Sequence, residues 1–211
     1  MATRANQTGA FADIVSRFGA AVTAKLRTGA GHGEAQLRDP FACVLKEAGA
    51  EIGVDVLTID ETPLDVLGVR PDFMIHTAGA QAGFAELKAR GRKVPTTWTP
   101  TKREQQQWEK LRLLPNVLYS DGEQWAVYHF GELFGTVAQL DGDLRTAGSA
   151  LRPVDEEFER VITEFLLWNP KPPRNIDDLV KAVANLCGLL RDEVSTTLRR
   201  EQRGERNARA R

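Results

Sequence analysis

The stretch Val69–Lys88 constrains the fold of this chain more than any other part of the sequence. Apolar residues recur both before and after the small-residue run Ala78–Gln81. The residues that separate one apolar residue from the next are polar or small. This pattern predicts a β-hairpin, with strands over Val69–Thr77 and Ala82–Lys88 and a turn between them. A hairpin of this length needs a sheet and covering helices to bury its apolar side.

The charged residues of this hairpin are expected to converge at one end. Side chains alternate between the two faces of a strand, so Glu86 and Lys88 point the same way while Leu87 points into the core. Pairing of the strands places Asp72 opposite them. Two neighbouring carboxylates repel each other, and a divalent cation with oxygen ligands relieves that repulsion, as Mg²⁺ does beside substrate phosphates. The residues therefore favour metal-assisted attack on a phosphate, with the lysine offsetting negative charge.

The order of these residues resembles a known family. Pro71–Asp72 followed by Glu86–Lys88 is similar to the PD-(D/E)xK motif of metal-dependent nucleases, in particular the Mrr-like ones. The downstream segments Arg103–Trp108, Leu114–Asn116 and Tyr119–Gly122, with Trp125 and Tyr128, extend the likeness. Their order resembles the nuclease domain at the N-terminus of single-chain type II and type I SP restriction–modification enzymes. The resemblance covers residues 34–132.

The resemblance implies a fold, a metal and a set of site residues. The fold class is α/β: a restriction-endonuclease-like mixed sheet flanked by helices. The metal is Mg²⁺, which Mn²⁺ is expected to replace, held by Asp72, Glu86 and the backbone oxygen of Leu87. The side chains implied in catalysis are Asp72, Glu86, Lys88, Glu34 and Gln107.

Each of these residues also has a purely structural interpretation. Asp72 is typical of a strand start after proline, and Glu86 and Lys88 are typical of an exposed strand end. Glu34 would be stabilised by the dipole at a helix N-terminus without any catalytic role. Gln107 ends a run of three glutamines, which leaves its alignment open by a position or two. Glu61, in the loop before the hairpin, is a further site candidate.

Basic residues cluster just after the hairpin. Arg90, Arg92, Lys93, Lys102 and Arg103 are expected to contact DNA phosphates beside the site, although charged runs are commonly only solvated surface. The formal net charge of the chain is −1, which argues against a protein that coats DNA and leaves room for a local basic face.

The spacing of apolar residues predicts the surrounding elements. Helices are expected over Thr8–Leu26, Glu34–Ala48 and Pro100–Leu114, with a break or kink in the second at Pro40. A strand is expected over Glu51–Ile59. Later in the chain, residues 116–120 and 124–130 are expected to pair about an Asp–Gly turn.

The chain is expected to divide into three parts. Residues 1–135 are predicted to form the nuclease domain, and residues 136–152 a linker or a small edge hairpin. Residues 153–211 are predicted to form a helical connector, with a disordered tail from residue 199. The chain carries no glycine-rich S-adenosylmethionine loop and no Asn-Pro-Pro-Tyr sequence. We therefore expect a shortened form, a natural fragment or a separate subunit.

The sequence as a whole predicts a Mg²⁺-dependent DNA endonuclease of a restriction–modification defence system. Its expected partners are DNA, a methyltransferase and specificity region, and a second copy in a homodimer. Two alternatives remain open: a non-catalytic DNA-binding or assembly module of the same fold, or a nuclease acting on RNA or in repair. Cys43 and Cys187 fit no disulfide or metal spacing, and no apolar run would cross a membrane, so a cytoplasmic location is expected.

Overall fold

The computed structural model describes most of the chain. The described residues are 4–29, 33–61, 63–65 and 67–169, with the single positions 176, 180 and 187. Residues 63–70 and 170–211 form a unit separate from the rest, and within it Leu64 and Val69 make an antiparallel bridge. The predicted helical connector from residue 170 onward and the predicted disordered tail therefore lie outside the described residues, except for these single positions.

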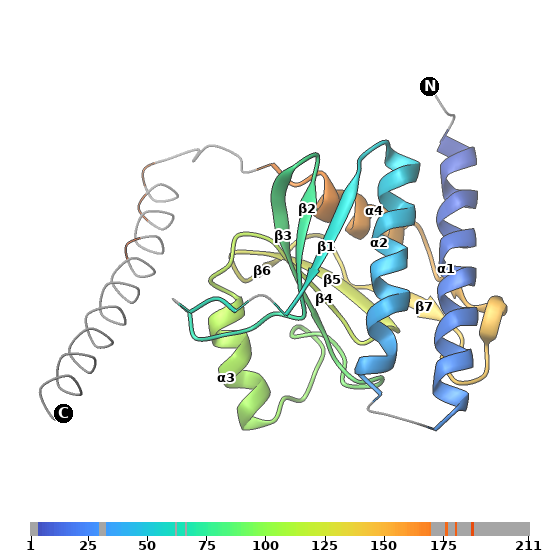
Figure 1. Ribbon diagram of the computed structural model, residues 1–211, viewed down its shortest axis with the longest axis horizontal. Helices are drawn as coiled ribbons and strands as arrows, with labels where there is room; N and C mark the ends of the chain where they lie inside the picture. Colours follow the sequence, from blue (N-terminus) through green and yellow to red (C-terminus); the bar gives the residue numbers. More distant parts are fainter. Residues whose placement is uncertain are drawn as a thin grey trace, which may run out of the picture. The chain divides into compact units, whose positions relative to one another are not determined.

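An eight-stranded sheet forms the centre of the molecule (Figure 1). The strands are β1 (Val56–Asp60), β2 (Phe73–Thr77), β3 (Ala80–Leu87), β4 (Val117–Ser120), β5 (Gln124–His129), β6 (Glu132–Leu133), β7 (Ala138–Asp141) and β8 (Arg152–Pro153). Their order is β1-β2-β3-β4-β5-β7-β8, with β6 paired to β5. Strands β3 and β4 are parallel and every other pair is antiparallel. A parallel pair needs a crossover connection, and a helix supplies it here.

Three helices pack on one face of the sheet: α1 (Arg4–Arg27), α2 (Arg38–Ile52) and α4 (Glu157–Leu166). They meet around Trp125 of β5, which is fully buried. Its ring centroid lies 5.6 Å from that of Phe18, 5.0 Å from that of Phe41 and 5.3 Å from that of Phe158. No helix in the described part is long and apolar enough to cross a membrane.

The crossover helix α3 (Lys102–Leu111) covers the opposite face (Figure 1). Its Trp108 packs edge-on against Tyr119 of β4 and Tyr128 of β5, at centroid distances of 5.9 and 4.8 Å. A capping box between Thr101 and Glu104 fixes the start of the helix, which satisfies backbone N–H groups that have no partner within the helix. The predicted class, a mixed α/β sheet flanked by helices, is confirmed.

The predicted hairpin is present as β2 and β3, with shorter limits. Its turn contains only Ala78 and Gly79, because both have positive φ angles, 49° and 82°, which suit a two-residue turn between twisted strands. The first strand begins at Phe73 and not at Val69. The proline at position 71 has no backbone N–H to donate, and Val69 pairs with Leu64 instead.

Two further limits differ from the sequence prediction. Helix α2 begins at Arg38, after a short 3₁₀ turn over Ala35–Leu37, and runs through without a break at Pro40. This proline lies in the first turn, where its missing N–H would have no helical partner anyway. The strand predicted from residue 51 begins only at residue 56, because Gly53, with a φ of 80°, ends the helix just before it.

Residues 136–152 form the edge hairpin and not the linker. They carry β7, the whole connection to β8 and the first residue of β8, and Leu140, Leu144 and Leu151 are buried in the same core as the helices. Helix α4 also packs into that core, so the buried core of the described residues continues across the predicted boundaries at 136 and 153. The strands of this hairpin have four and two residues, too few to show an alternating pattern.

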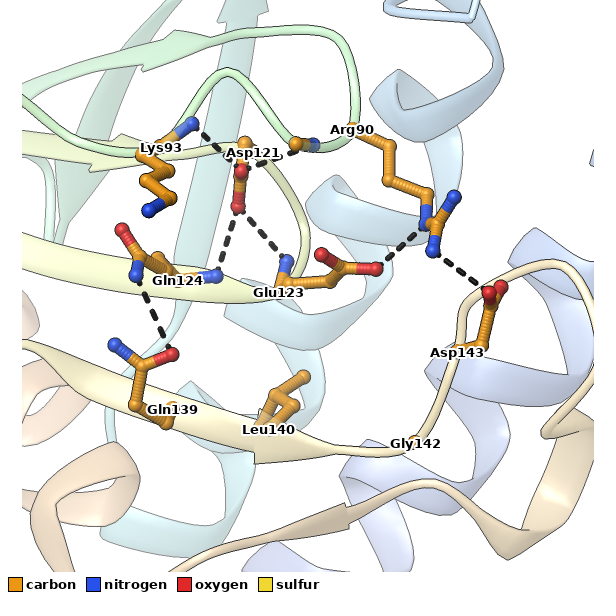
Figure 2. Close-up of a pocket in the computed structure, with 10 residues that line it drawn as sticks. Arg90, Lys93, Asp121, Glu123, Gln124, Gln139, Leu140, Gly142 and Asp143 are labelled. Carbon is orange, nitrogen blue, oxygen red and sulfur yellow. Dashed lines mark hydrogen bonds and ion pairs between the residues drawn. The ribbon is translucent and has the colours of Figure 1, made fainter. Parts of the chain in front are cut away.

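The turn from β4 to β5 is organised by a buried aspartate, Asp121 (Figure 2). Its carboxylate accepts hydrogen bonds from the backbone N–H groups of Glu123 and Gln124 in its own turn, at 3.0 and 2.8 Å. It also accepts from the N–H groups of Gly91 and Lys93, at 3.1 and 2.8 Å. One side chain thus ties the loop after β3 to the next hairpin of the sheet.

Candidate active site

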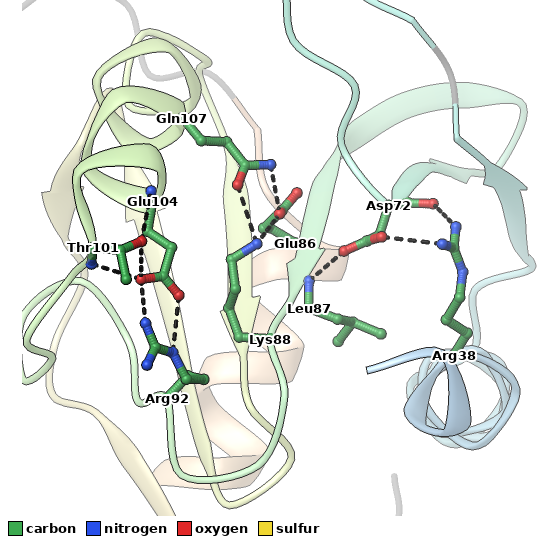
Figure 3. A network of polar contacts seen from close by, with 9 residues as sticks. All are labelled: Arg38, Asp72, Glu86, Leu87, Lys88, Arg92, Thr101, Glu104 and Gln107. Carbon is green, nitrogen blue, oxygen red and sulfur yellow. Dashed lines mark hydrogen bonds and ion pairs between the residues drawn. The ribbon is translucent and has the colours of Figure 1, made fainter. Parts of the chain in front are cut away.

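The centre of the site is a triad of Glu86, Lys88 and Gln107 on the α3 face of the sheet, with Gln107 half-buried (Figure 3). Glu86 of β3 is 2 % exposed and Lys88 is 6 % exposed. The Oε1 atom of Glu86 forms an ion pair with the Lys88 ammonium and accepts a hydrogen bond from Gln107 Nε2 at 2.7 Å. Lys88 also donates to Gln107 Oε1 at 3.1 Å. The structure therefore brings together three of the predicted site residues: Glu86 of β3, Lys88 directly after it and Gln107 of α3.

Asp72 lies at the entry to β2, beside the end of β3. Its Oδ2 accepts a hydrogen bond from the backbone N–H of Leu87 at 2.7 Å. Its Oδ1 lies 3.2 Å from Arg38 Nη1, and its backbone oxygen accepts from Arg38 Nη2 at 3.0 Å. The hairpin thus places Asp72 next to the Glu86–Lys88 segment, as the strand pairing predicts.

Glu34 reaches the site from a turn and not from the core helix on which the resemblance places it. It precedes the 3₁₀ turn that leads into α2. Its carboxyl accepts a hydrogen bond from the backbone of Ala89 and interacts electrostatically with Lys88 and Asp72. Glu61, the further candidate, lies beside Asp72: its backbone N–H donates to the backbone oxygen of Asp72 at 2.9 Å, and its side chain pairs with Arg38 at 3.0 Å.

Burial raises the proton affinity of all three carboxyls near the site. The pKa of Glu86 rises to about 7, chiefly because burial penalises its charge, and Asp72 and Glu34 add repulsion while Lys88 opposes the rise. Burial is also the largest cause of the raised pKa values of Asp72 and Glu34. Clustered, desolvated carboxyls are a recurring property of functional sites, and a cation would relieve their repulsion.

The fit to a metal rests on one atom in particular. Glu86 Oε2 is buried and has no hydrogen-bond partner among the described residues. A buried carboxylate oxygen without a partner is costly, and a bound cation would satisfy it. No group of three or more His, Cys, Asp or Glu side chains in the described part is arranged to hold a metal. The site offers two carboxylates, Asp72 and Glu86, and Mg²⁺ in proteins is commonly held by one or two carboxylates with waters and substrate phosphate oxygens.

The five basic residues predicted to contact DNA fall into two groups. Arg90 pairs with Glu123 at 2.6 Å and with Asp143 at 2.7 Å, beside a hollow of about 290 Å³ at the β4–β5 turn (Figure 2). Arg92 pairs with Glu104 (Figure 3). The other group consists of Lys93, Lys102 and Arg103, which are exposed and form no ion pair with another described residue.

Two residues at the site were not predicted from the sequence. Arg38 holds Asp72, and its guanidinium lies 5.3 Å from the ring centroid of Phe73. Tyr119, paired with Glu86 across β3 and β4, places its ring 5.8 Å from the Lys88 ammonium. No local pattern in the sequence pairs Arg38 with Asp72, which lies 34 residues away along the chain. Nothing in the sequence pairs Tyr119 with the lysine.

Comparison with known proteins shows that the chain shares its fold with a solved structure. No protein-family model matches the chain, and no curated protein matches it. Among solved structures, a chain of the DrdV–DNA complex determined by cryo-EM is similar, with a TM-score of 0.51 and 19 % identity. The likeness covers 74 % of this chain and 14 % of that one. The chain therefore spans about one seventh of the length of its structural neighbour.

Proposed function

We propose that this chain is a Mg²⁺-dependent DNA endonuclease domain. The observation that carries the proposal is the buried Glu86–Lys88 ion pair, held by Gln107 beside Asp72, with one Glu86 oxygen that has no partner among the described residues. A lysine buried against a carboxylate, next to a second carboxylate, has no evident use in packing and a direct use in phosphodiester hydrolysis. The fold shared with a chain of a DNA complex supports DNA as the substrate.

Asp72, Glu86 and the backbone oxygen of Leu87 would hold the metal, with Mn²⁺ able to replace Mg²⁺. When bound, the metal supplies an activated water and neutralises charge on the phosphate. Lys88 offsets the negative charge that develops on the phosphate oxygens, and Gln107 holds the lysine through its amide oxygen at 3.1 Å. Glu34 adds a carboxyl that can orient a water. The products would be a 5′-phosphate and a 3′-hydroxyl.

We place this activity in a restriction–modification system. The matched part makes up 14 % of the neighbour's chain. We propose in addition that a methyltransferase and specificity region, in a longer chain or a separate subunit, acts together with this domain. Cleavage of both strands requires two active sites or two visits, so a homodimer on DNA is part of the proposal.

A plasmid-nicking assay with Mg²⁺ or Mn²⁺ tests the proposal. We expect Asp72→Asn, Glu86→Gln and Lys88→Ala each to lower the nicking rate at least about 100-fold, because each removes charge that acts on the reacting phosphate or its metal. The matched controls are the same substitutions at exposed positions: Asp13→Asn, Glu51→Gln and Lys46→Ala. They should cut at the wild-type rate.

Other outcomes separate the alternatives. A wild type that is inert with both metals, and that binds neither metal in an Asp72-dependent way, contradicts the nuclease proposal. Retained DNA binding in that case favours a non-catalytic module of the same fold. Faster cleavage of RNA than of DNA at one salt concentration would favour an RNA nuclease.

A further inference from the structure

Two polar contacts join helix α3 to the loop that follows β3 (Figure 3). The first contact is Lys88 with Gln107, inside the site. The second is Arg92 with Glu104, at the loop's outer end, where Arg92 Nε donates to Glu104 Oε1 at 2.9 Å and a second guanidinium nitrogen bonds the other oxygen. Glu104 and Gln107 are three residues apart, so they lie on one face of the helix. The two contacts therefore act on the same face of α3.

Glu104 is unusually well bound for a residue near the surface. Besides the guanidinium, its Oε2 accepts from the backbone N–H and the hydroxyl of Thr101, both at 2.7 Å. These bonds hold the pKa of Glu104 near 2, with the Arg92 hydrogen bond as the largest cause. A carboxylate that both caps α3 and receives the fork of an arginine fixes the start of the helix relative to the loop.

We infer that the Arg92–Glu104 ion pair is a clamp that positions Gln107 against Lys88, which makes Arg92 a positioning residue and not a phosphate contact. The inference rests on the proposed function. Two N–H donors of the Arg92 guanidinium already bond the Glu104 carboxylate. If these donors bonded a DNA phosphate instead, the Glu104 carboxylate would lose its cation while lying close to the DNA. The negative charges of the carboxylate and the phosphates would then repel each other. Lys102 and Arg103, exposed and without an ion pair in the described part, are better placed to bind phosphate.

The first test needs no activity. It follows the side-chain amide resonances of Gln107 by NMR in the full chain without metal or DNA, with exposed Gln106 as the internal reference. We expect Arg92→Ala to move the Gln107 resonances toward those of Gln106, because the amide loses its fixed contacts. Arg103→Ala should leave them in place. Glu104→Gln keeps a capping side chain and removes the charge, so it should reproduce the Arg92→Ala shift.

The second test separates positioning from DNA binding. Under single-turnover conditions we expect Arg92→Ala to lower the cleavage rate about 10-fold to 100-fold, a range typical of small misplacements. Its DNA affinity and the dependence of that affinity on salt should match wild type. Arg103→Ala should instead reduce the salt slope by about 0.9, the value for one lost phosphate contact.

The inference is overturned if Arg92→Ala leaves the Gln107 resonances unchanged, or if it reduces the salt slope as Arg103→Ala does. An inert wild type contradicts the nuclease proposal alone, because the NMR test still decides whether Arg92 and Glu104 fix Gln107. Equal melting temperatures of wild type and Arg92→Ala exclude general loss of structure as the cause of a shift.

Discussion

At the scale of single residues, Glu86 makes the stability of the metal-free protein depend on pH. Its pKa is about 7 in the fold, against 4.5 as its ordinary value, so the folded state binds more protons between these limits. The free energy of unfolding should therefore fall as the pH rises from about 4.5 to 7. We expect Glu86→Gln to flatten this part of the curve by up to about 1.4 kcal/mol per pH unit, measured by thermal melting in chelator.

The control for this measurement is Glu51→Gln at the exposed end of α2, which should retain the wild-type slope. Added Mg²⁺ should stabilise wild type more at pH 8 than at pH 5, because the cation binds the carboxylate form of Glu86 and competes with protons. Parallel curves for wild type and Glu86→Gln would mean that the Glu86 carboxyl titrates as it does in the unfolded chain.

Arg38 allows a second prediction at this scale. Its guanidinium is 23 % exposed and bonds both the side chain and the backbone of Asp72. Arg38→Met leaves the Asp72 carboxyl, which is 13 % exposed, without this cation, and we expect it to lower the free energy of unfolding by about 2 kcal/mol in urea melts. Arg17→Met removes an exposed pair with Glu47 and should cost less than about 1 kcal/mol. Equal losses would show that Arg38 is only a surface ion pair.

At the scale of elements, the sequence pattern predicted those elements that depend on interactions between residues close together in the chain. Alternation and small turn residues predicted the β2–β3 hairpin, and hairpin geometry then placed Asp72 beside Glu86 and Lys88. The contacts of Arg38 and Asp121 were not predictable, because their partners lie 34 and about 30 residues away along the chain. The break expected at Pro40 failed because a proline's effect depends on its position within the helix, which composition does not give.

The close approach of β3, β4 and α4 gives a prediction for this scale. A Cβ atom on Gly83 would lie 2.6 Å from the backbone oxygen of Asn116 and 2.9 Å from the ring of Phe165. We expect Gly83→Ala to lower the free energy of unfolding by about 1–3 kcal/mol, because backbone cannot move aside without shifting the strand that carries the site. Urea melts measure the loss.

The same substitution on an open helix surface provides the control. A Cβ atom on Gly9 in α1 meets nothing within 4 Å, and alanine favours helix over glycine. Gly9→Ala should therefore be neutral or stabilising by up to about 1 kcal/mol. A Gly83→Ala protein as stable as wild type would show that β3 and β4 can separate freely at this point.

At the scale of the whole molecule, one core joins segments that the sequence assigns to different domains. Residues of α1, α2, the sheet, the edge hairpin and α4 pack together, and the buried cluster runs from Phe11 to Leu166. Short strands such as β8 carry too few residues for a periodic signal, so their place in this core emerges only in three dimensions. The predicted nuclease domain of residues 1–135 therefore omits part of its own core.

Truncation tests this view of the core. A chain that ends at Gly135 loses the edge hairpin and α4, which exposes the rings of Trp125 and Phe11 where Phe158 now covers them. Losing one buried aromatic contact residue typically costs about 3–5 kcal/mol, and the truncation removes several buried residues at once. That sum reaches the total stability of an ordinary domain, so this form should not unfold cooperatively in circular-dichroism melts. A chain that ends at Asn169 keeps the whole described core and should melt in one transition. A cooperative transition in the shorter chain would contradict this expectation and would support a domain that ends at residue 135.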